Sequence, residues 1–337
     1  MRQLTAVLAL GLLAASSARA ADLAPTKTYM LSRLEALKVS SSKLVAAGDA
    51  YYALAKGAGF DYAQLWKTRP DRTRAALDAV RAAWKDASPR YEQIEGFFAG
   101  NEPFTSYDTI IDAADPGTTG DNTVKFDVRL PDGRVLHSPG ALFNFTESAL
   151  WDLNPNYRAL KVNLGGQIGN ALPDANVVKG GVAALDSQIA ALLKVARGWQ
   201  PSTPFVFTTL VSNLPTTGDF LDIWKNSRFV QGGGTKETEF AAISRLNDLR
   251  DNIGSWQAIY RGVSPDVKSK NAALDSQVTG GLTDLRAYVQ RLIAQEQVRR
   301  FTPEQAEGII SEAQNRATAL TGKLTQAAAL LNVKVSQ

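Results

Sequence analysis

The stretch Asp71–Gly100 reads DRTRAALDAVRAAWKDASPRYEQIEGFFAG and indicates the fold of the chain. Its apolar side chains recur at steps of three and four residues, at Leu77, Val80, Trp84, Ala87, Tyr91, Ile94 and Phe98. That period is typical of a helix that buries one stripe in a bundle. Pro89 lies inside the stripe and predicts a kink, which would re-aim the turn that carries Glu92 and Glu95.

The helical period continues through most of the chain. Further helices are predicted at residues 26–56, 182–195, 240–260 and 274–293. Thr302-Pro-Glu-Gln305 is a capping box that opens a last helix. Between these segments, loops are predicted at residues 200–218, rich in Ser, Thr and Pro, and at residues 231–234.

One region lacks the helical period. Residues 122–138 alternate around Pro131-Asp-Gly133, as a β-hairpin does. Ser138 and Pro139 then predict an N-cap and the first position of a new helix. We therefore expect an all-α fold of two four-helix-bundle-like halves in a pseudo-twofold relation, with a small β-hairpin insertion near residues 122–138.

The first twenty residues are typical of a signal peptide. Arg2 is followed by an apolar run from Ala6 to Ala15, which is too short to span a bilayer, and then by Ala18-Arg-Ala20. Cleavage after Ala20 would release a chain for the periplasm, and no transmembrane segment is predicted in it. We expect one domain over residues 21–335, with a first bundle over about 21–170 and a second over about 171–335.

Composition excludes several kinds of chemistry. The chain has no cysteine and one histidine, His137, so disulfides, thiolate metal sites and sites with two histidines are excluded. Loss of the signal peptide leaves 35 of the 37 Lys and Arg residues against 33 Asp and Glu residues, a net charge of +2. Because no basic cluster stands out, nucleic acid is not an expected partner.

Acidic side chains at helical spacing are the candidate site. Glu92 and Glu95 are three residues apart, and Asp108 and Asp112 are four apart. In the stretch LFNFTESALW, residues 142–151, Asn144 and Glu147 are again three apart. Such spacing is common on solvated helix edges. Carboxylates that instead face a bundle interior need a partner, a proton or a cation, so a metal pocket is the alternative.

The same segments resemble the imelysin family, which includes EfeO-like periplasmic proteins. The resemblance rests on Trp84…Pro-Arg-Tyr-Glu-Gln-Ile-Glu95, on Asp108-Thr-Ile-Ile-Asp-Ala113 and on residues 142–151, where the family has Gly-x-His-x-x-Glu. It implies a fold of two four-helix bundles and a role in iron uptake with a membrane permease. It also implies a metal site, whose counterparts here are Glu92, Glu95, Asp112, Asn144 and Glu147.

The chain departs from the family pattern at two positions, where Leu142 replaces the glycine and Asn144 the histidine. Asparagine offers an oxygen and no imidazole nitrogen, so the change favours Ca²⁺ or Mn²⁺ relative to Fe²⁺, and Asn144 is expected to be a weak or indirect ligand. His137 would reach the site only if the hairpin folded back over it.

Three functions are compatible with these features. The first is an exported binding protein that captures a metal cation, with iron implied by the resemblance, and that is not an enzyme. The second is a divergent member that binds a polysaccharide or peptide in the cleft between the bundles, using the two predicted loops with Trp199 and Trp224. The third is a metallopeptidase, for which the residues offer no convincing nucleophile.

Overall fold

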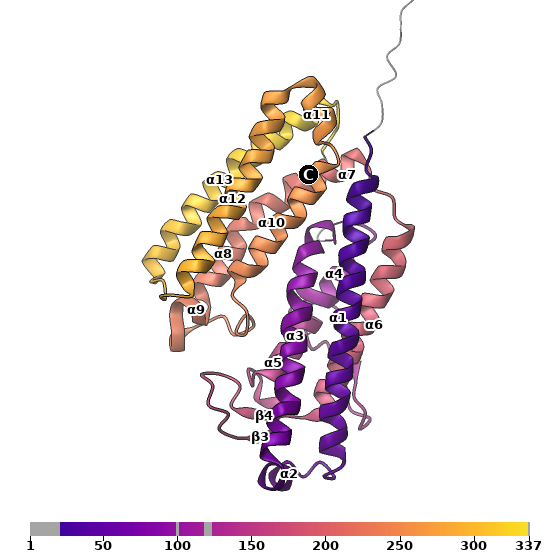
Figure 1. Cartoon of the computed structure of the whole chain (residues 1–337), viewed down its shortest axis with the longest axis vertical. Helices are drawn as coiled ribbons and strands as arrows, with labels where there is room; N and C mark the ends of the chain where they lie inside the picture. The colour runs from indigo at the N-terminus through magenta and orange to yellow at the C-terminus, as the bar shows by residue number, and fades with distance from the viewer. Residues whose placement is uncertain (1–20, 99–100, 118–122, 336–337) are drawn as a thin grey trace, which may run out of the picture.

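The computed structural model describes residues 21–98, 101–117 and 123–335, so the predicted signal peptide, residues 1–20, lies outside the described residues. Two helical bundles lean against each other (Figure 1). The all-α prediction with a small β-hairpin insertion is confirmed. Within the described residues, no helix is both long enough and apolar enough to cross a membrane.

The first bundle contains most of the N-terminal half of the chain. Its elements are α1 (Ala24–Lys56), α2 (Tyr62–Thr68), α3 (Pro70–Phe98), α4 (Thr105–Asp108), the π-helical turn η1 (Thr109–Ala113), α5 (Leu142–Leu150), the 3-10 turn η2 (Pro155–Tyr157) and α6 (Ala175–Gly198). The stripe predicted on α3 is buried at every position, from Leu77 to Phe98. Helix α3 continues through Pro89, so the turn with Glu92 and Glu95 remains helical.

The second bundle contains the rest of the chain. Its elements are α7 (Thr203–Asn213), η3 (Leu214–Thr216), α8 (Thr217–Asn226), α9 (Arg228–Gln231), η4 (Gly232–Gly234), α10 (Arg245–Arg261), α11 (Ser264–Lys270), α12 (Ala272–Glu296) and α13 (Pro303–Leu330). The capping box predicted at Thr302 and Gln305 opens α13. Because α6 packs along α1, the change of bundle comes after Gly198, later than the predicted boundary near residue 170.

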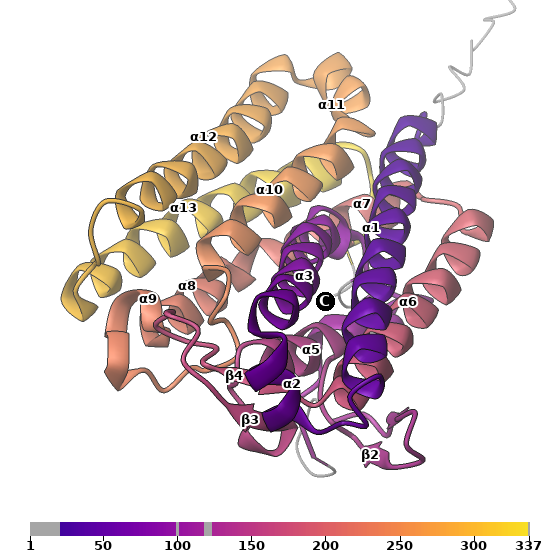
Figure 2. The same ribbon diagram turned by 60° about the horizontal axis from the view of Figure 1, so that its bottom comes forward.

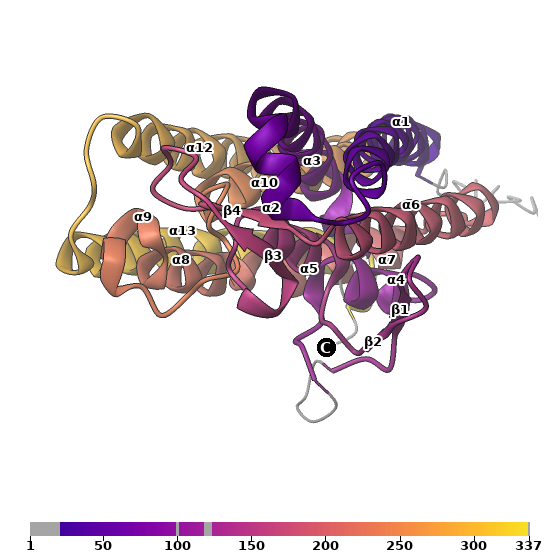
Figure 3. The same ribbon diagram turned by 90° about the horizontal axis from the view of Figure 1, so that it is seen from below.

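Two antiparallel hairpins lie beside the first bundle. Strands β1 (Asp127–Arg129) and β2 (Val135–His137) form the predicted hairpin, which projects away from the helices in the view from below (Figure 3). Strands β3 (Arg158–Lys161) and β4 (Ala171–Pro173) form a second hairpin that the sequence did not predict.

The predicted helix start at Ser138 and Pro139 is wrong. Ser138 has a φ of 44°, and the helix begins only at Leu142, without a side-chain cap. The reason is that the chain between strand and helix is fixed in other contacts: Ser138 N–H donates to the Phe126 carbonyl at 3.0 Å, and Ala141 N–H to the Ala114 carbonyl at 2.8 Å.

The loop predicted over residues 200–218 is also wrong, because α7 and the start of α8 occupy it. Thr and Val lower helix propensity, but burial of Val206, Phe207 and Leu210 outweighs that small penalty. Ser202 caps the helix by accepting a hydrogen bond from Phe205 N–H. The predicted helix over 240–260 begins later, at Arg245, and leaves residues 235–244 as an irregular connection.

The two bundles meet where α3 crosses α10, and the two helices lie side by side in both views (Figures 1 and 2). A Cβ atom on Gly96 would overlap Ser255 Oγ and lie 2.8 Å from the Trp256 ring. Glycine at this position therefore permits a close helix contact, directly beside Glu95.

Candidate metal centre

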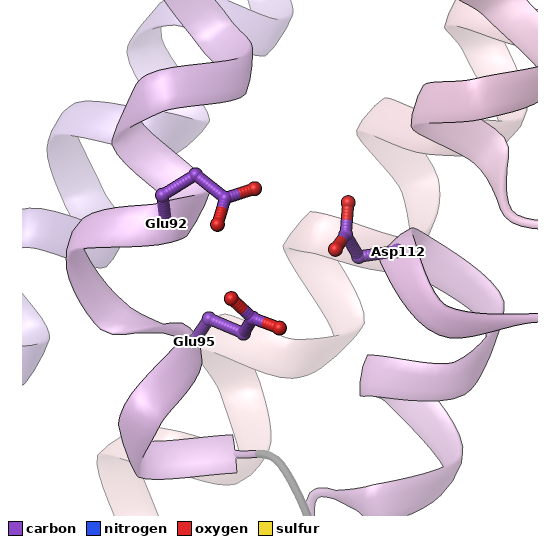
Figure 4. Close-up of side chains that lie close together, drawn as sticks. All are labelled: Glu92, Glu95 and Asp112. Atoms are coloured by element: carbon purple, nitrogen blue, oxygen red, sulfur yellow. The ribbon is translucent and has the colours of Figure 1, made fainter. Parts of the chain in front are cut away.

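Three carboxylates from two elements of the first bundle converge on one point. Glu92 and Glu95 lie on α3, and Asp112 lies in the π-helical turn η1. One oxygen atom of each lies within 4.8 Å of the others, and the three side chains point toward one another (Figure 4). All three residues are buried. Among the described residues, this is the one group of three acidic, histidine or cysteine side chains close enough to share an ion.

The π-helical turn places Asp112 in this group. Ala114 N–H donates to the Thr109 carbonyl at 2.8 Å, five residues back, so the turn is wider than an α-helical one. Within the described residues, Asp112 has no hydrogen bond or ion pair, although it is buried. A buried carboxylate without a partner is costly, and a bound cation would remove that cost.

A side chain from the second bundle holds the two glutamates. Asn252 on α10 donates its amide to Glu92 Oε2 at 2.9 Å and also to Glu95 Oε2. The amide has no charge, so it orients the two carboxylates without neutralising them. The candidate site is therefore built at the contact between the bundles and needs both.

One buried cation lies next to the cluster. Arg245 lies between the rings of Phe220 and Phe240, 4.2 and 4.1 Å from the two centroids, and forms an ion pair with Asp248 at 3.3 Å. The Arg245 guanidinium thus faces the three clustered carboxylates and Asp248, whereas the neighbouring Arg250 is paired with Asp251. If all four acids were ionised, the region would carry an excess of negative charge.

The pKa values reflect this excess. Burial raises the pKa of Glu92, and the neighbouring Glu95, Asp248 and Asp112 raise it further, while Arg245 opposes them. Burial and Glu95 likewise raise the pKa of Asp112. Burial raises the pKa of Asp248 to about 6, against the opposing effect of Arg245. The raised pKa values mean that added positive charge, whether from protons or from a cation, would stabilise the region.

Asp108, the other acid of the Asp108–Asp112 pair, has a different role. Tyr91 Oη donates to Asp108 Oδ1 at 2.6 Å, inside the first bundle. Burial, followed by the charge of Glu95, raises the Asp108 pKa to about 7, and the Tyr91 hydrogen bond lowers it in part. Asp108 stands behind the cluster and adds to its negative potential.

Glu147 lines a small cavity beside the cluster but lies outside the three-carboxylate group. The cavity measures about 10 Å³, about the size needed for one water, and is also lined by Glu92, Asp112 and Asp248. Glu147 Oε1 accepts hydrogen bonds from the N–H groups of Ala241, at 3.1 Å, and Ala242, at 2.6 Å. Burial raises its pKa, and these two donors oppose the rise.

Asn144 lies on the wall of the same cavity, one turn before Glu147. Its amide donates to Glu239 Oε2 at 3.3 Å, so this side chain is bonded to the connection that leads into the second bundle. Burial and the nearby Glu237 and Asp115 raise the pKa of Glu239 to about 7.

His137 does not join the candidate site. It lies at the end of β2, its side chain is 73% exposed, and its Nδ1 lies 3.1 Å from Asp127 Oδ1 on the paired strand. His137 is in neither the three-carboxylate group nor the lining of the small cavity beside it.

The two tryptophans proposed for ligand stacking serve the core. Trp224 is fully buried, packs against Phe301, and donates its indole N–H to Glu296 Oε1 at 2.6 Å. Trp199 is half-buried against Phe104 and Phe205. A pocket of about 290 Å³ does lie between the bundles, but its lining includes Ile168, Arg228 and Arg300 and neither tryptophan.

Sequence reasoning missed the contribution of α10. Arg245, Asp248 and Asn252 step by three and four residues beside the apolar positions Leu246, Leu249 and Ile253. Buried polar residues that follow the core period were the available signal.

Comparison with known proteins gives a matching family. The family model described as Imelysin (Peptidase_M75) matches residues 28–326, which covers most of the chain, both bundles and every side chain of the candidate site. The search of curated proteins found no match. The chain belongs to the imelysin family.

Proposed function

We propose that this protein captures a metal cation at Glu92, Glu95 and Asp112 and holds it for an uptake partner in the membrane. The observation that carries the proposal is the convergence of three buried carboxylates within 4.8 Å, beside an Arg245 guanidinium that is already paired with Asp248. A divalent or trivalent cation would supply the missing positive charge and would displace the protons that the raised pKa values retain.

Iron is the cargo we propose, on the basis of the motifs shared with iron-linked imelysin proteins. The donor set consists of oxygens, which suits hard and borderline cations and also admits Mn²⁺ or Ca²⁺. Asn144 faces the cavity from its wall and would add at most an amide oxygen. Glu147 uses Oε1 for its two hydrogen bonds, so only its Oε2 would be left to add to the donor set.

Export fits this role. Members of the imelysin family are typically exported proteins, and the first twenty residues are typical of a cleavable signal peptide. We propose that the chain works in the periplasm and delivers its cation to an inner-membrane permease.

Calorimetric titration of the exported chain with Fe²⁺, Fe³⁺, Mn²⁺ and Ca²⁺ tests the proposal. The wild-type chain should bind at least one of these cations, and Glu92→Ala/Glu95→Ala should not. Glu304→Ala/Glu307→Ala is the matched control, because these two glutamates have the same spacing on the exposed face of α13. A double variant Glu92→Ala/Glu95→Ala that binds as tightly as wild type would refute the assigned site.

We propose binding rather than catalysis, because the acids of the site are held in place to carry charge: Asn252 orients Glu92 and Glu95, and Tyr91 donates to Asp108. Incubation of the pure protein with unfolded peptides, with and without added cation, tests peptide cleavage directly. Cation-dependent hydrolysis that Glu92→Ala/Glu95→Ala abolishes would instead assign a metallopeptidase. Saccharide binding that survives chelation would support the alternative of a glycan-binding member.

A further inference from the structure

The connection before α10 covers the candidate metal centre. Residues 235–244, here called the lid segment, run from the end of η4 to the N-cap of α10 and contain no helix or strand. Phe240 and Ile243 from this segment line the small cavity, opposite Glu92 and Asp112. A cation that reached the carboxylates from this side would have to pass it.

The middle of the lid segment is held by side chains alone. Among the described residues, positions 238–243 make no backbone-to-backbone hydrogen bond. Their backbone groups bond instead to Glu147, which accepts from Ala241 and Ala242, to Arg228, which donates to the Ala241 carbonyl at 2.7 Å, and to Glu237 Oε1, which accepts from Glu239 N–H at 3.2 Å. Opening the segment would break these few bonds and expose the small apolar surface of Ala241, Ala242 and Ile243.

The ends of the segment are fixed and its flanks are open. The backbone N–H groups of Lys236 and Glu237 donate to the Asn226 carbonyl at 3.2 and 3.1 Å, and the Ser244 side chain caps α10. The inter-bundle pocket of about 290 Å³ and a second pocket of about 330 Å³ both adjoin the segment, and Thr238 lines both. Fixed ends with free space beside the middle are what a hinged cover requires.

Both side chains that fasten the segment across the bundles come from α5. Glu147 accepts from its backbone, and Asn144 donates to its Glu239. Asn144 lines both the outer pocket of about 330 Å³ and the small inner cavity, so the Asn144–Glu239 contact stands between them. Releasing these contacts would join the outer pocket to the carboxylates.

We propose that residues 235–244 are the lid of the cation site and that Glu147 is the positioning residue that latches it, rather than a ligand. The inference rests on the proposed function for its cargo, and on the contacts of Glu147 for the latch. Opening lets a cation reach Glu92, Glu95 and Asp112 through the outer pocket, and closing retains it.

Two substitutions at one position separate a latch from a ligand. In Glu147→Gln the amide oxygen still accepts from Ala241 and Ala242, but the charge that a cation would need is gone. In Glu147→Met both the accepting oxygen and the charge are lost, while the volume of the side chain stays similar. A latch predicts that chelator-induced cation release is about tenfold faster in Glu147→Met and within about threefold of wild type in Glu147→Gln. Equal loss of affinity in both variants would make Glu147 a ligand and overturn the proposal.

Hydrogen exchange in the cation-free chain tests the latch without any cargo. The N–H groups of Ala241 and Ala242 should exchange about tenfold faster in Glu147→Met than in wild type, with Glu147→Gln in between. Asp275→Asn, which alters another buried carboxylate with one donor, Tyr260, should leave this exchange unchanged. Wild-type exchange in Glu147→Met overturns the latch, whereas a wild-type chain that binds no cation refutes the proposed function instead.

A milder variant covers the case in which Glu147→Met does not fold. Glu239→Ala removes the fastening to Asn144 from a half-buried position, so the fold should survive. We expect cation release about threefold faster than wild type, with faster exchange at residues 239–243. Unchanged release and exchange in this variant would count against a lid at residues 235–244.

Discussion

Each bundle contains a buried tyrosine that donates to an aspartate, yet only one of the two pairs stands beside a candidate site. In the first bundle Tyr91 on α3 donates to Asp108 at 2.6 Å, and in the second Tyr260 on α10 donates to Asp275 at 3.0 Å. Helix α10 ends at Arg261, one residue after its tyrosine, whereas α3 continues to Phe98.

The continuation of α3 makes the difference. Glu92 occupies the position that matches Arg261, and the residues beyond it add Glu95, which faces Asn252 of the other bundle, and Gly96, which lets α3 approach α10 closely. The extra length of α3 thus supplies the second glutamate of the carboxylate site. The second bundle thus supplies orientation and countercharge, through Asn252 and Arg245, while the first bundle supplies the three clustered carboxylates.

Filling the close contact between α3 and α10 at Gly96 should have a large effect on stability. Gly96→Ala would place a Cβ against Ser255 Oγ and the Trp256 ring, so we expect the free energy of unfolding to fall by about 2–3 kcal/mol. Urea denaturation measures the change.

A matched substitution in open space controls for helix propensity. Gly308 lies inside α13 with nothing within 4 Å of an added Cβ, so Gly308→Ala should stabilise by about 0.5–1 kcal/mol. If both variants shift stability in the same direction, the close approach of α3 and α10 is not what Gly96 provides.

The fold was predictable to the extent that it depends on period and caps. The stripe from Leu77 to Phe98 and the capping box at Thr302 are local signals, and both are confirmed. Helix α7 was missed because its stability comes from burial of Val206 and Phe207, and burial cannot be read from a segment rich in Thr and Pro. The division between bundles was displaced because α6 returns to pack on α1.

Only the part of the candidate site that the first bundle contributes was predictable from the sequence. Glu92, Glu95 and Asp112 come from motifs close together in the chain, and the structure brings them together. Glu147 was expected in the same group, but its carboxylate bonds to Ala241, 94 residues away. Asn252 lies 160 residues from Glu92, so neither contact has a signal in local spacing.

The stability of the cation-free chain should depend on pH, because buried carboxyl groups beside the contact between the bundles have raised pKa values. Carboxyl groups with a pKa higher in the folded chain contribute stability that is complete below about pH 4 and is lost as the pH rises through the folded-state pKa. With a pKa of about 6 for Asp248 and about 7 for Asp108, and with the pKa values of Glu92 and Asp112 raised, the cation-free chain should lose about 4 kcal/mol or more of stability between pH 5 and pH 8.

Asp112→Asn and a saturating cation should each reduce this slope, since both lower the number of protons that folding retains. Denaturant titrations at several pH values measure it. A chain whose stability rises from pH 5 to pH 8, or an Asp112→Asn variant with an unchanged slope, would contradict the assignment of buried excess charge to the first bundle.

The smallest expected effects come from removing the two tyrosine hydroxyls, and they separate the bundles most finely. Tyr91→Phe and Tyr260→Phe should each cost about 1 kcal/mol, because each leaves a buried aspartate without its donor. Only Tyr91→Phe should also weaken cation binding, by about twofold, because loss of the hydrogen bond raises the pKa of Asp108 and so reduces the negative potential behind the cluster. Parallel calorimetric titrations of the two variants measure this difference, and an equal change in affinity would mean that the tyrosine–aspartate pair of the first bundle is as remote from the cation as that of the second.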